Sequence, residues 1–390
     1  MSRSVSIIGG SAAGFLTGAL LARRGFEVQI FESADRFDPT RRTLIVTNRL
    51  KELLGQDCNG AVLNEIHEFE LFADSMVSSI KLDKPDLIID RSILIQGLAN
   101  ETDKLGVKTM LGHRFVNVET NGKGLQLVVE EGTRRKSILT DIVVGADGAF
   151  SKVRRAGGWP QQATVPIMQA IVSLPEGMSS STSRIWFVPE DTPYFYWLIP
   201  ESERKAAIGV IGEDGRKMRS RMVHFLESHS FTPIEFQAAR IPCYTQWMPI
   251  SRRMGDGTIY LVGDAAGHVK VSTVGGIVTG LQGAFGVAEA ISNGGSASEL
   301  THLRHELDLH LLIRKVLHGW QQDDYVRLLR VLNKKTHHVL GSVTRDEAYR
   351  LLRRLLLKQP KLLLLGIRSL ISASRFPNDY LQRENHRNKD

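Results

Sequence analysis

Residues 4–32, SVSIIGGSAAGFLTGALLARRGFEVQIFE, decide how the chain begins to fold. The apolar run 4–9 leads into a Gly/Ala-rich turn and predicts a buried strand. Residues 12–24 follow as a predicted helix with small residues on its packing face, and Gly25 ends it. Residues 28–31 are again apolar and predict the next strand. This order predicts a βαβ unit, the setting in which a glycine-rich turn binds a dinucleotide.

The glycine-rich turn has the sequence GGSAAG at residues 9–14. Gly9 permits the tight turn, and Gly14 allows the helix to pack closely on the sheet. Ser11 stands where a third glycine is usual, but its small side chain still lets a pyrophosphate approach the helix N-terminus. Because a turn of this kind can also be an ordinary strand-to-helix connection, the prediction needs further support.

Glu32 ends the second predicted strand, eighteen residues beyond Gly14. A carboxylate at this place accepts hydrogen bonds from both hydroxyls of an adenosine ribose. The same negative charge would repel a 2′-phosphate. Together with the turn, Glu32 and the neighbouring Ser33 therefore predict a dinucleotide without that phosphate.

Two later stretches, VVGADG at residues 143–148 and GDAAGHVKVSTVGGI at residues 263–277, repeat the pattern of a buried strand, small residues and an aspartate. Asp264 is placed to hydrogen-bond the sugar-alcohol chain of a flavin. Gly275 and Gly276 precede a predicted helix, so their amides can face the negative charge of a reduced flavin. Either stretch alone would also serve as a simple turn.

The order of these motifs resembles that of the FAD-dependent hydroxylase-type flavoproteins, and most closely that of the geranylgeranyl reductase family. The resemblance is carried by GDAAGHVKVSTVGGI and by FYWLIP at residues 195–200, and it covers most of residues 1–300. It implies that the chain binds FAD noncovalently. The chain departs from the family at Phe195, Ile199 and Val271, where Tyr, Phe and Pro are usual.

By this resemblance Arg41 or Arg42, and Arg91, approach the FAD, and the backbone at Phe115 meets the adenine. Each arginine can instead be a solvated surface charge. Some family members carry a cysteine where this chain has Arg41 and Arg42. The complete set of expected cofactor-binding residues is Gly9, Gly10, Ser11, Ala13, Gly14, Glu32, Ser33, Arg41, Arg42, Arg91, Phe115, Asp147, Gly148, Asp264, Gly275, Gly276 and Ile277.

Candidate catalytic residues lie on one predicted strand and in the late motif. Alternation places Phe195, Trp197 and Ile199 on one face, where aromatic rings opposite a flavin would suit a prenyl chain. Ordinary sheet core is the alternative, since aromatic residues favour strands. His268 is either a proton donor or a loop residue held by hydrogen bonds without a catalytic role. Lys270 either offsets the charge of a reduced flavin or faces solvent.

The chain has 390 residues, 42% apolar and 24% charged, which is the composition of a globular protein of two or three domains. We predict an α/β fold with a discontinuous Rossmann-like FAD-binding domain, an antiparallel-sheet substrate domain and a helical C-terminal region. Two separate cysteines predict neither a disulfide framework nor a metal site. The expected ranges are 1–75, 90–160 and 252–300 for the FAD-binding domain, 76–89 and 161–251 for the substrate domain, and 301–390 for the helical region.

The C-terminal region is basic, because residues 301–390 hold 18 Lys/Arg and 9 Asp/Glu in a chain of net charge +8. Residues 350–375, RLLRRLLLKQPKLLLLGIRSLISASR, contain no acid and many leucines. They predict a helix in the interface of an anionic membrane, and a core helix with a solvated charged face is the alternative. We expect a cytoplasmic protein, peripheral on the inner face of the membrane, without a signal peptide, a membrane-spanning run or a nucleic-acid partner.

The leading functional hypothesis is FAD-dependent reduction of carbon–carbon double bonds in an isoprenoid or other lipid. NAD(P)H or another reductant would supply the electrons. A flavin-dependent monooxygenase or halogenase is the first alternative, because FYWLIP also resembles the WxWxIP signature of flavin halogenases, with Phe195 in place of the first Trp. A non-catalytic flavin- or lipid-binding protein at a membrane is the second alternative.

Overall fold

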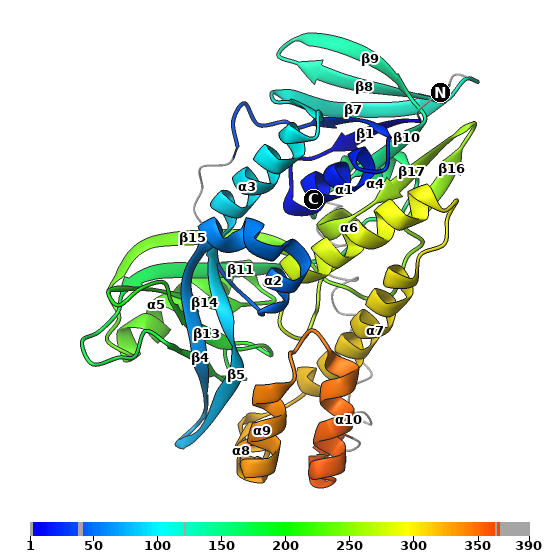
Figure 1. Cartoon of the computed structure of the whole chain (residues 1–390). Coiled ribbons are helices and arrows are strands. Elements are labelled where there is room, and N and C mark those ends of the chain that lie inside the picture. Colours follow the sequence, from blue (N-terminus) through cyan, green and yellow to red (C-terminus); the bar gives the residue numbers. More distant parts are fainter. Residues whose placement is uncertain (1–2, 38–41, 121, 363–364, 367–390) are drawn as a thin grey trace.

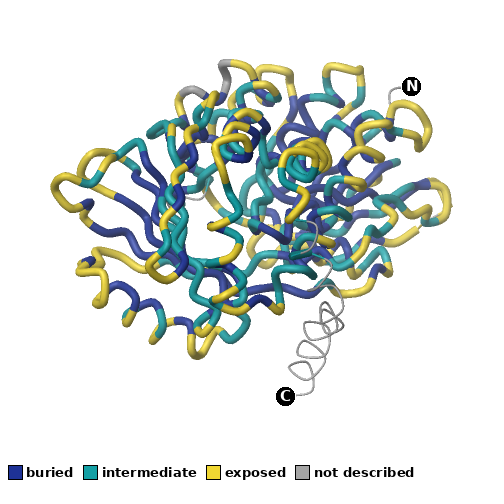
Figure 2. Tube along the Cα trace, turned by 90° about the horizontal axis from the view of Figure 1, so that it is seen from below, coloured by how far each residue is buried: buried dark blue, intermediate teal, exposed yellow. Residues whose placement is uncertain are grey.

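The structure, a computed structural model, describes residues 3–37, 42–120, 122–362 and 365–366. Within these residues the strands form sheets of six, eight and three strands, with helices packed around them (Figure 1). Buried positions run through the interior of the molecule and exposed positions mark its periphery (Figure 2). The architecture confirms the predicted α/β fold with an antiparallel sheet and a helical C-terminal region.

The first predicted strand, β1 (Ser4–Ile8), lies inside the six-stranded sheet, parallel to β2 (Glu27–Phe31) and β10 (Ile142–Gly145). β17 (Gly257–Leu261) continues the parallel set beside β10. Because parallel strands end at the same edge of a sheet, the three sequence motifs meet at one edge. The outer strands of this sheet are β6 (Lys108–Met110) and β16 (Ser251–Met254).

Both faces of the six-stranded sheet are covered, which explains why its strands are unbroken apolar runs. On one face, Ile7 and Ile30 belong to a core shared with α1 (Ala12–Ala22), α3 (Arg91–Lys104) and α6 (Ile277–Ser292). On the other face, Ile8 and Phe31 pack against the three-stranded sheet. That sheet consists of β7 (His113–Thr120), β8 (Leu125–Glu131) and β9 (Arg134–Thr140).

The eight-stranded sheet supplies the predicted antiparallel layer. Its strand order is β15 (Pro233–Pro242), β11 (Thr164–Ser173), β14 (Lys205–Ile211), β13 (Tyr196–Pro200), β12 (Thr182–Trp186), β4 (Val62–Ala73), β5 (Met76–Asp90) and β3 (Thr43–Val46). Neighbouring strands are antiparallel apart from β12 and β4, which run parallel. α5 (Gly215–Ser228) covers one face, where Met222 and Phe225 pack with Tyr196 and Leu198.

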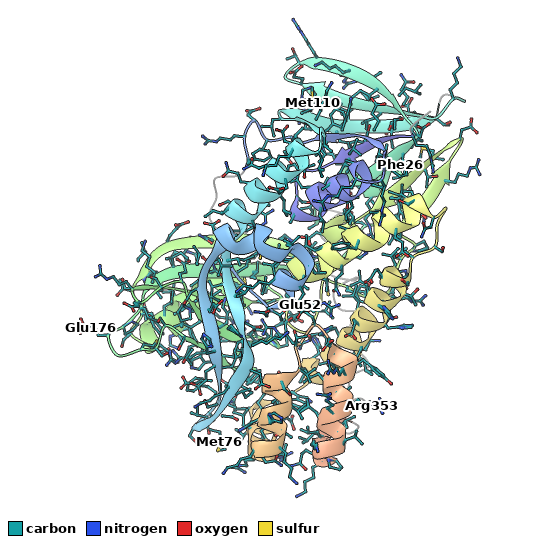
Figure 3. The ribbon with its side chains drawn as sticks, in the orientation of Figure 1. Phe26, Glu52, Met76, Met110, Glu176 and Arg353 are labelled. Carbon is teal, nitrogen blue, oxygen red and sulfur yellow. The ribbon has the colours of Figure 1, made fainter. Side chains whose placement is uncertain are left out.

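The hairpin of β4 and β5 is the longest antiparallel pair of the eight-stranded sheet. The two strands are 12 and 15 residues long, and Met76 lies at the tip of the hairpin (Figure 3). Register shifts near Asn64 and Ile66 interrupt the ladder, and such bulges break the alternation from which strand lengths are inferred. β3 and β4 fall within residues 1–75, expected in the FAD-binding domain, and pair in the eight-stranded sheet.

The C-terminal region is helical: α7 (Ser298–His318), α8 (Gln322–Val331), α9 (Lys334–Ser342) and α10 (Ala348–Lys358). α7 packs against α6, whereas α8 and α9 pack against the β4–β5 hairpin. In the described part of the chain, every helix is too short or too polar to span a bilayer. Smaller elements are α2 (Arg49–Leu54), α4 (Lys152–Ala156) and the 3-10 turns η1 (Gly55–Ala61) and η2 (Gly263–Ala266).

Candidate functional site

A cleft of about 680 Å³ opens at the edge of the six-stranded sheet where β1, β2 and β10 end. This edge is where open α/β sheets bind their ligands. Ala13 and Gly14 lie beside the cleft, at the start of α1. The cleft walls bring together these predicted cofactor-binding residues: Gly9, Gly10, Ser11, Glu32, Ser33, Arg91, Phe115, Asp147 and Gly148.

The glycine-rich turn is shaped by two close backbone approaches. Gly9 has a φ of 108°, and a Cβ there would lie 2.4 Å from the carbonyl oxygen of Ala146. A Cβ on Gly14 would lie 2.3 Å from the carbonyl oxygen of Gly9. The Ser11 hydroxyl accepts a hydrogen bond from the Gly14 amide at 3.1 Å and caps α1. The serine therefore stabilises the helix start, which explains why the turn tolerates the loss of a glycine.

Glu32 lies at the end of β2 and is held against the turn. One carboxylate oxygen accepts a hydrogen bond from the Gly10 amide at 2.7 Å. The other accepts hydrogen bonds from the Ala34 amide at 2.9 Å and from the Ser33 hydroxyl at 3.0 Å. These contacts fix the carboxylate at the cleft wall, where it suits ribose hydroxyls and disfavours a 2′-phosphate.

Asp147 follows β10 and lines the cleft, and its carboxylate also organises the next turn. It accepts hydrogen bonds from the Lys152 amide at 2.7 Å, the Val153 amide at 3.1 Å and the Ser151 hydroxyl. Burial raises the pKa of Asp147, although these hydrogen bonds act in the opposite direction. The aspartate thus fixes the path of the loop between β10 and α4.

Several further residues line the cleft that no motif of the sequence predicts. Arg36 and Phe37 follow Glu32 on the same loop, and Phe150 and Lys152 follow the second motif. Phe150 is 59% exposed, which is unusual for an aromatic side chain of this size. The path of each loop decides which side chains face the cleft, and this path cannot be derived from the sequence. The only feature of the sequence that could have indicated these residues is that each lies near a motif.

Arg91 connects the cleft to the late motif. It begins α3, and its main-chain amide donates a hydrogen bond to the Arg42 carbonyl at 3.1 Å. Burial raises the pKa of Asp264, and the positive charge of Arg91 acts against this rise. Asp264 also faces the start of α6, because a Cβ on Gly276 would lie 3.1 Å from its carboxylate oxygen. Arg41 lies outside the described residues.

The loop before α6 is narrow and conformationally strained. The Lys270 amide donates a hydrogen bond to the Gly275 carbonyl at 3.1 Å. Val274 has a φ of 52°, a left-handed conformation that costs energy for a β-branched residue. Gly276 caps α6, which begins at Ile277 and has no acidic residue in its first turn. The positive end of this helix dipole is therefore not neutralised by the helix itself.

Phe195 and Trp197 form an aromatic surface beside this loop. Their rings meet edge to face, with centroids 6.2 Å apart. Both pack, partly buried, against a cluster that contains Val269, Val271 and Val274. Neighbouring β13 side chains point to the opposite face under α5, which confirms the predicted alternation. The aromatic face and the late-motif loop thus build one apolar wall.

His268 is 1% exposed and stacks on Trp247, with ring centroids 5.7 Å apart. A Cβ on Gly283 would lie 2.1 Å from the Nδ1 atom of His268, so the ring is pressed against α6. Among the described residues, neither ring nitrogen has a hydrogen-bond partner. Burial lowers the pKa of His268 to about 3, and the ring is therefore neutral near pH 7. This placement favours a packing role over proton donation.

The parallel sheet, the glycine-rich turn, the carboxylate after β2 and the two further loops define a dinucleotide-binding flavoprotein of the hydroxylase type. The site fits FAD, because Gly9, Gly10 and Ser11 line the cleft and α1 begins beside it, so that the positive end of this helix faces the cleft. The chain belongs to the FAD-binding-domain family, whose model matches residues 2–316. It is an FAD-dependent oxidoreductase.

Individual relatives are distant but similar over nearly the whole chain. The digeranylgeranylglycerophospholipid reductase of Methanothrix thermoacetophila is 24% identical, covering 93% of this chain and 98% of the relative. A geranylgeranyl bacteriochlorophyll reductase-like structure from Thermoplasma acidophilum has a TM-score of 0.75 at 16% identity, covering 96% and 100% of the two chains. The p-nitrophenol 4-monooxygenase of Pseudomonas putida has a TM-score of 0.62 at 16% identity, covering 95% and 98%.

Proposed function

We propose that this protein reduces carbon–carbon double bonds in the isoprenoid chains of a lipid. The observation that carries the proposal is the apolar wall of Phe195, Trp197 and the valines of the late-motif loop. An extended hydrocarbon gains binding energy from such a surface through burial alone. The names of the relatives, reductases of geranylgeranyl lipids, support the same substrate class.

When FAD is bound and reduced, it would supply a hydride to an alkene carbon. NAD(P)H or another reductant would then reduce the FAD again. The protein holds the adenosine end through Glu32 and the turn at Gly9. The apolar wall orients the chain and excludes water from it. The ring of His268 is neutral and enclosed, and it contributes to the packing of the loop. We name no side chain as the donor of the proton that completes the reduction of the double bond.

Replacing Trp197 by leucine tests the proposed substrate. We expect lipid-driven reoxidation of the reduced enzyme to lose about tenfold or more in kcat/KM, because roughly 1.5–3 kcal/mol of apolar contact is removed. The measurement is anaerobic mixing with a geranylgeranyl lipid, followed by mass spectrometry for two added hydrogens per double bond. The control Phe236→Leu changes a 36% exposed aromatic residue on β15 of the same sheet. Wild-type rates in Trp197→Leu would contradict the proposal.

A monooxygenase or halogenase remains the second candidate, because solved structures of both kinds share the fold. A second mixing of the reduced enzyme, with oxygen, halide and an aromatic substrate present beside the lipid, separates the functions. Oxygen or halide incorporated into an aromatic product, with lipid left unreduced, would favour this candidate over the reductase.

We further propose peripheral membrane contact through α10, which presents basic and apolar side chains together. Arg353 and Arg354 are exposed, as Figure 3 shows for Arg353, and Leu357 is 73% exposed. The predicted segment 350–375 continues beyond Leu362 mostly outside the described residues. Basic stems and leucines on one short helix suit the headgroup region of an anionic bilayer.

Charge reversal on α10 tests this contact. Each basic residue near an anionic surface contributes about 1 kcal/mol, so losing two corresponds to about 30-fold weaker binding. Arg353→Glu with Arg354→Glu also adds repulsion and is therefore expected to weaken binding to phosphatidylglycerol vesicles at least about 30-fold. Cosedimentation with vesicles measures the affinity, and phosphatidylcholine vesicles give the uncharged reference. The matched control reverses Arg216 and Lys217, two exposed cations on α5. Equal losses in both double variants would show general electrostatics instead of a contact through α10.

A further inference from the structure

Lys270, in the loop that precedes α6, forms a buried ion pair with Asp346, which lies between α9 and α10. Lys270 is 5% exposed and Asp346 is 3% exposed, so Lys270 does not face solvent. The Thr47 hydroxyl donates a hydrogen bond to the second carboxylate oxygen. Burial by itself would raise the pKa of Asp346, but the charge and hydrogen bond of Lys270, helped by Thr47, lower it to about 2. The carboxylate is therefore ionised near pH 7.

The loop is also anchored by contacts outside this pair. The Ser272 hydroxyl and the His310 ring already connect the loop to α7 at 2.6 Å. Arg345 and Asp86 form a neighbouring ion pair that fixes the segment before α10 to β5. Because desolvation offsets most of the attraction within a buried ion pair, apolar partners of equal volume are often at least as stabilising. Stability alone therefore does not explain why a charged lysine is buried at position 270.

The position of Lys270 indicates a further role. Its side chain runs along Gly275, since a Cβ there would lie 3.4 Å from Cε and 3.8 Å from Nζ. Gly275 directly precedes the capping residue of α6, whose first turn carries no acid. Lys270 thus adds a positive charge at the start of α6, which the Asp264 carboxylate also faces. Asp346, from the segment between α9 and α10, balances part of that charge.

We propose that Lys270 raises the reduction potential of the bound FAD and that Asp346 is a positioning residue that limits this effect. Two electrons and one proton convert the flavin ring into an anion. A nearby cation stabilises that anion relative to the neutral oxidised ring. The inference rests on the FAD site of the proposed function and is independent of the lipid substrate.

Dye-equilibrated redox titration of the FAD-containing protein, with dithionite as the reductant, tests the proposal. Lys270→Met is expected to shift the reduction equilibrium about tenfold toward oxidised FAD, which lowers the two-electron potential by about 30 mV. Asp346→Asn leaves the cation uncompensated and is expected to raise the potential by a similar amount. Asp86→Asn, the comparison variant, removes a buried carboxylate that pairs with Arg345 and feels Lys270 only more weakly. It is expected to change the potential by less than Asp346→Asn does.

The double variant Lys270→Met with Asp346→Leu keeps the test decisive if a single variant fails to fold. It leaves no buried charge unpaired, so we expect near wild-type stability and a potential lowered in the direction of Lys270→Met. A wild-type potential in this double variant, with FAD fully bound, would overturn the proposal. The proposal would also be overturned if Lys270→Met, Asp346→Asn and Asp86→Asn all shifted the potential in the same direction. Failure of lipid reduction with the expected potentials would refute only the proposed substrate.

Discussion

Gly9→Ala is expected to yield a protein that no longer retains FAD and is about 3 kcal/mol less stable toward unfolding. The added Cβ would lie 2.4 Å from the Ala146 carbonyl oxygen, in a backbone conformation with φ of 108°. Steric overlap in a packed region and an unfavourable φ each cost roughly 1–3 kcal/mol. The backbone must shift to relieve the overlap, and this shift displaces both the turn and the loop after β10 that face the cleft.

Gly25→Ala provides the matched control for this prediction. Gly25 also has a positive φ, 83°, but a Cβ there would meet no atom within 4 Å. We expect this variant to lose about 1 kcal/mol and to keep its FAD. Flavin absorbance per protein and urea unfolding measure the two effects. If Gly9→Ala retained one FAD per chain, the assignment of this turn to the cofactor would be wrong.

The convergence of three distant motifs could be predicted from the sequence because each motif is local. Small residues directly after a buried strand mark the ends of β1, β10 and β17 without any tertiary information, and an aspartate follows the last two strands. Parallel pairing then places Gly9, Asp147 and Asp264 at one sheet edge. The cleft confirms this convergence for the first two motifs, and Arg91 connects it with the third.

Features that depend on contacts between distant segments could not be predicted. Lys270 has its partner 76 residues later, and no local pattern marks Asp346 as that partner. A histidine in this loop suggests proton chemistry when only its residue type is known. Its burial depends on distant residues, namely the ring of Trp247 and Gly283, which has no side chain and leaves space for the imidazole. The lengths of β4 and β5 could not be predicted either, because bulges in the ladder resemble strand ends in the sequence.

His268→Leu is expected to make the protein markedly more resistant to acid. The folded pKa of His268 is about 3, against an ordinary value of 6.5. Between these values the unfolded chain binds a proton that the folded chain does not, so stability falls as pH decreases. The slope is about 1.4 kcal/mol per pH unit for one group, or roughly 3 kcal/mol between pH 6.5 and pH 4. Leucine removes this loss, and no hydrogen bond from the ring to the described residues is sacrificed.

Urea unfolding at a series of pH values between 7 and 4 measures this effect as a difference in slope. Stability at pH 7 reports the change in packing, whereas the dependence on pH reports the proton. His268→Gln separates the two further, because it keeps a polar side chain that cannot titrate and is expected to flatten the curve as leucine does. Stability curves that stay parallel to wild type in both variants would mean that the folded and unfolded rings have the same pKa, so that the ring is protonated within the fold below about pH 6.5. A protonated ring would restore His268 as a candidate proton donor, so the same measurement decides between packing and catalysis.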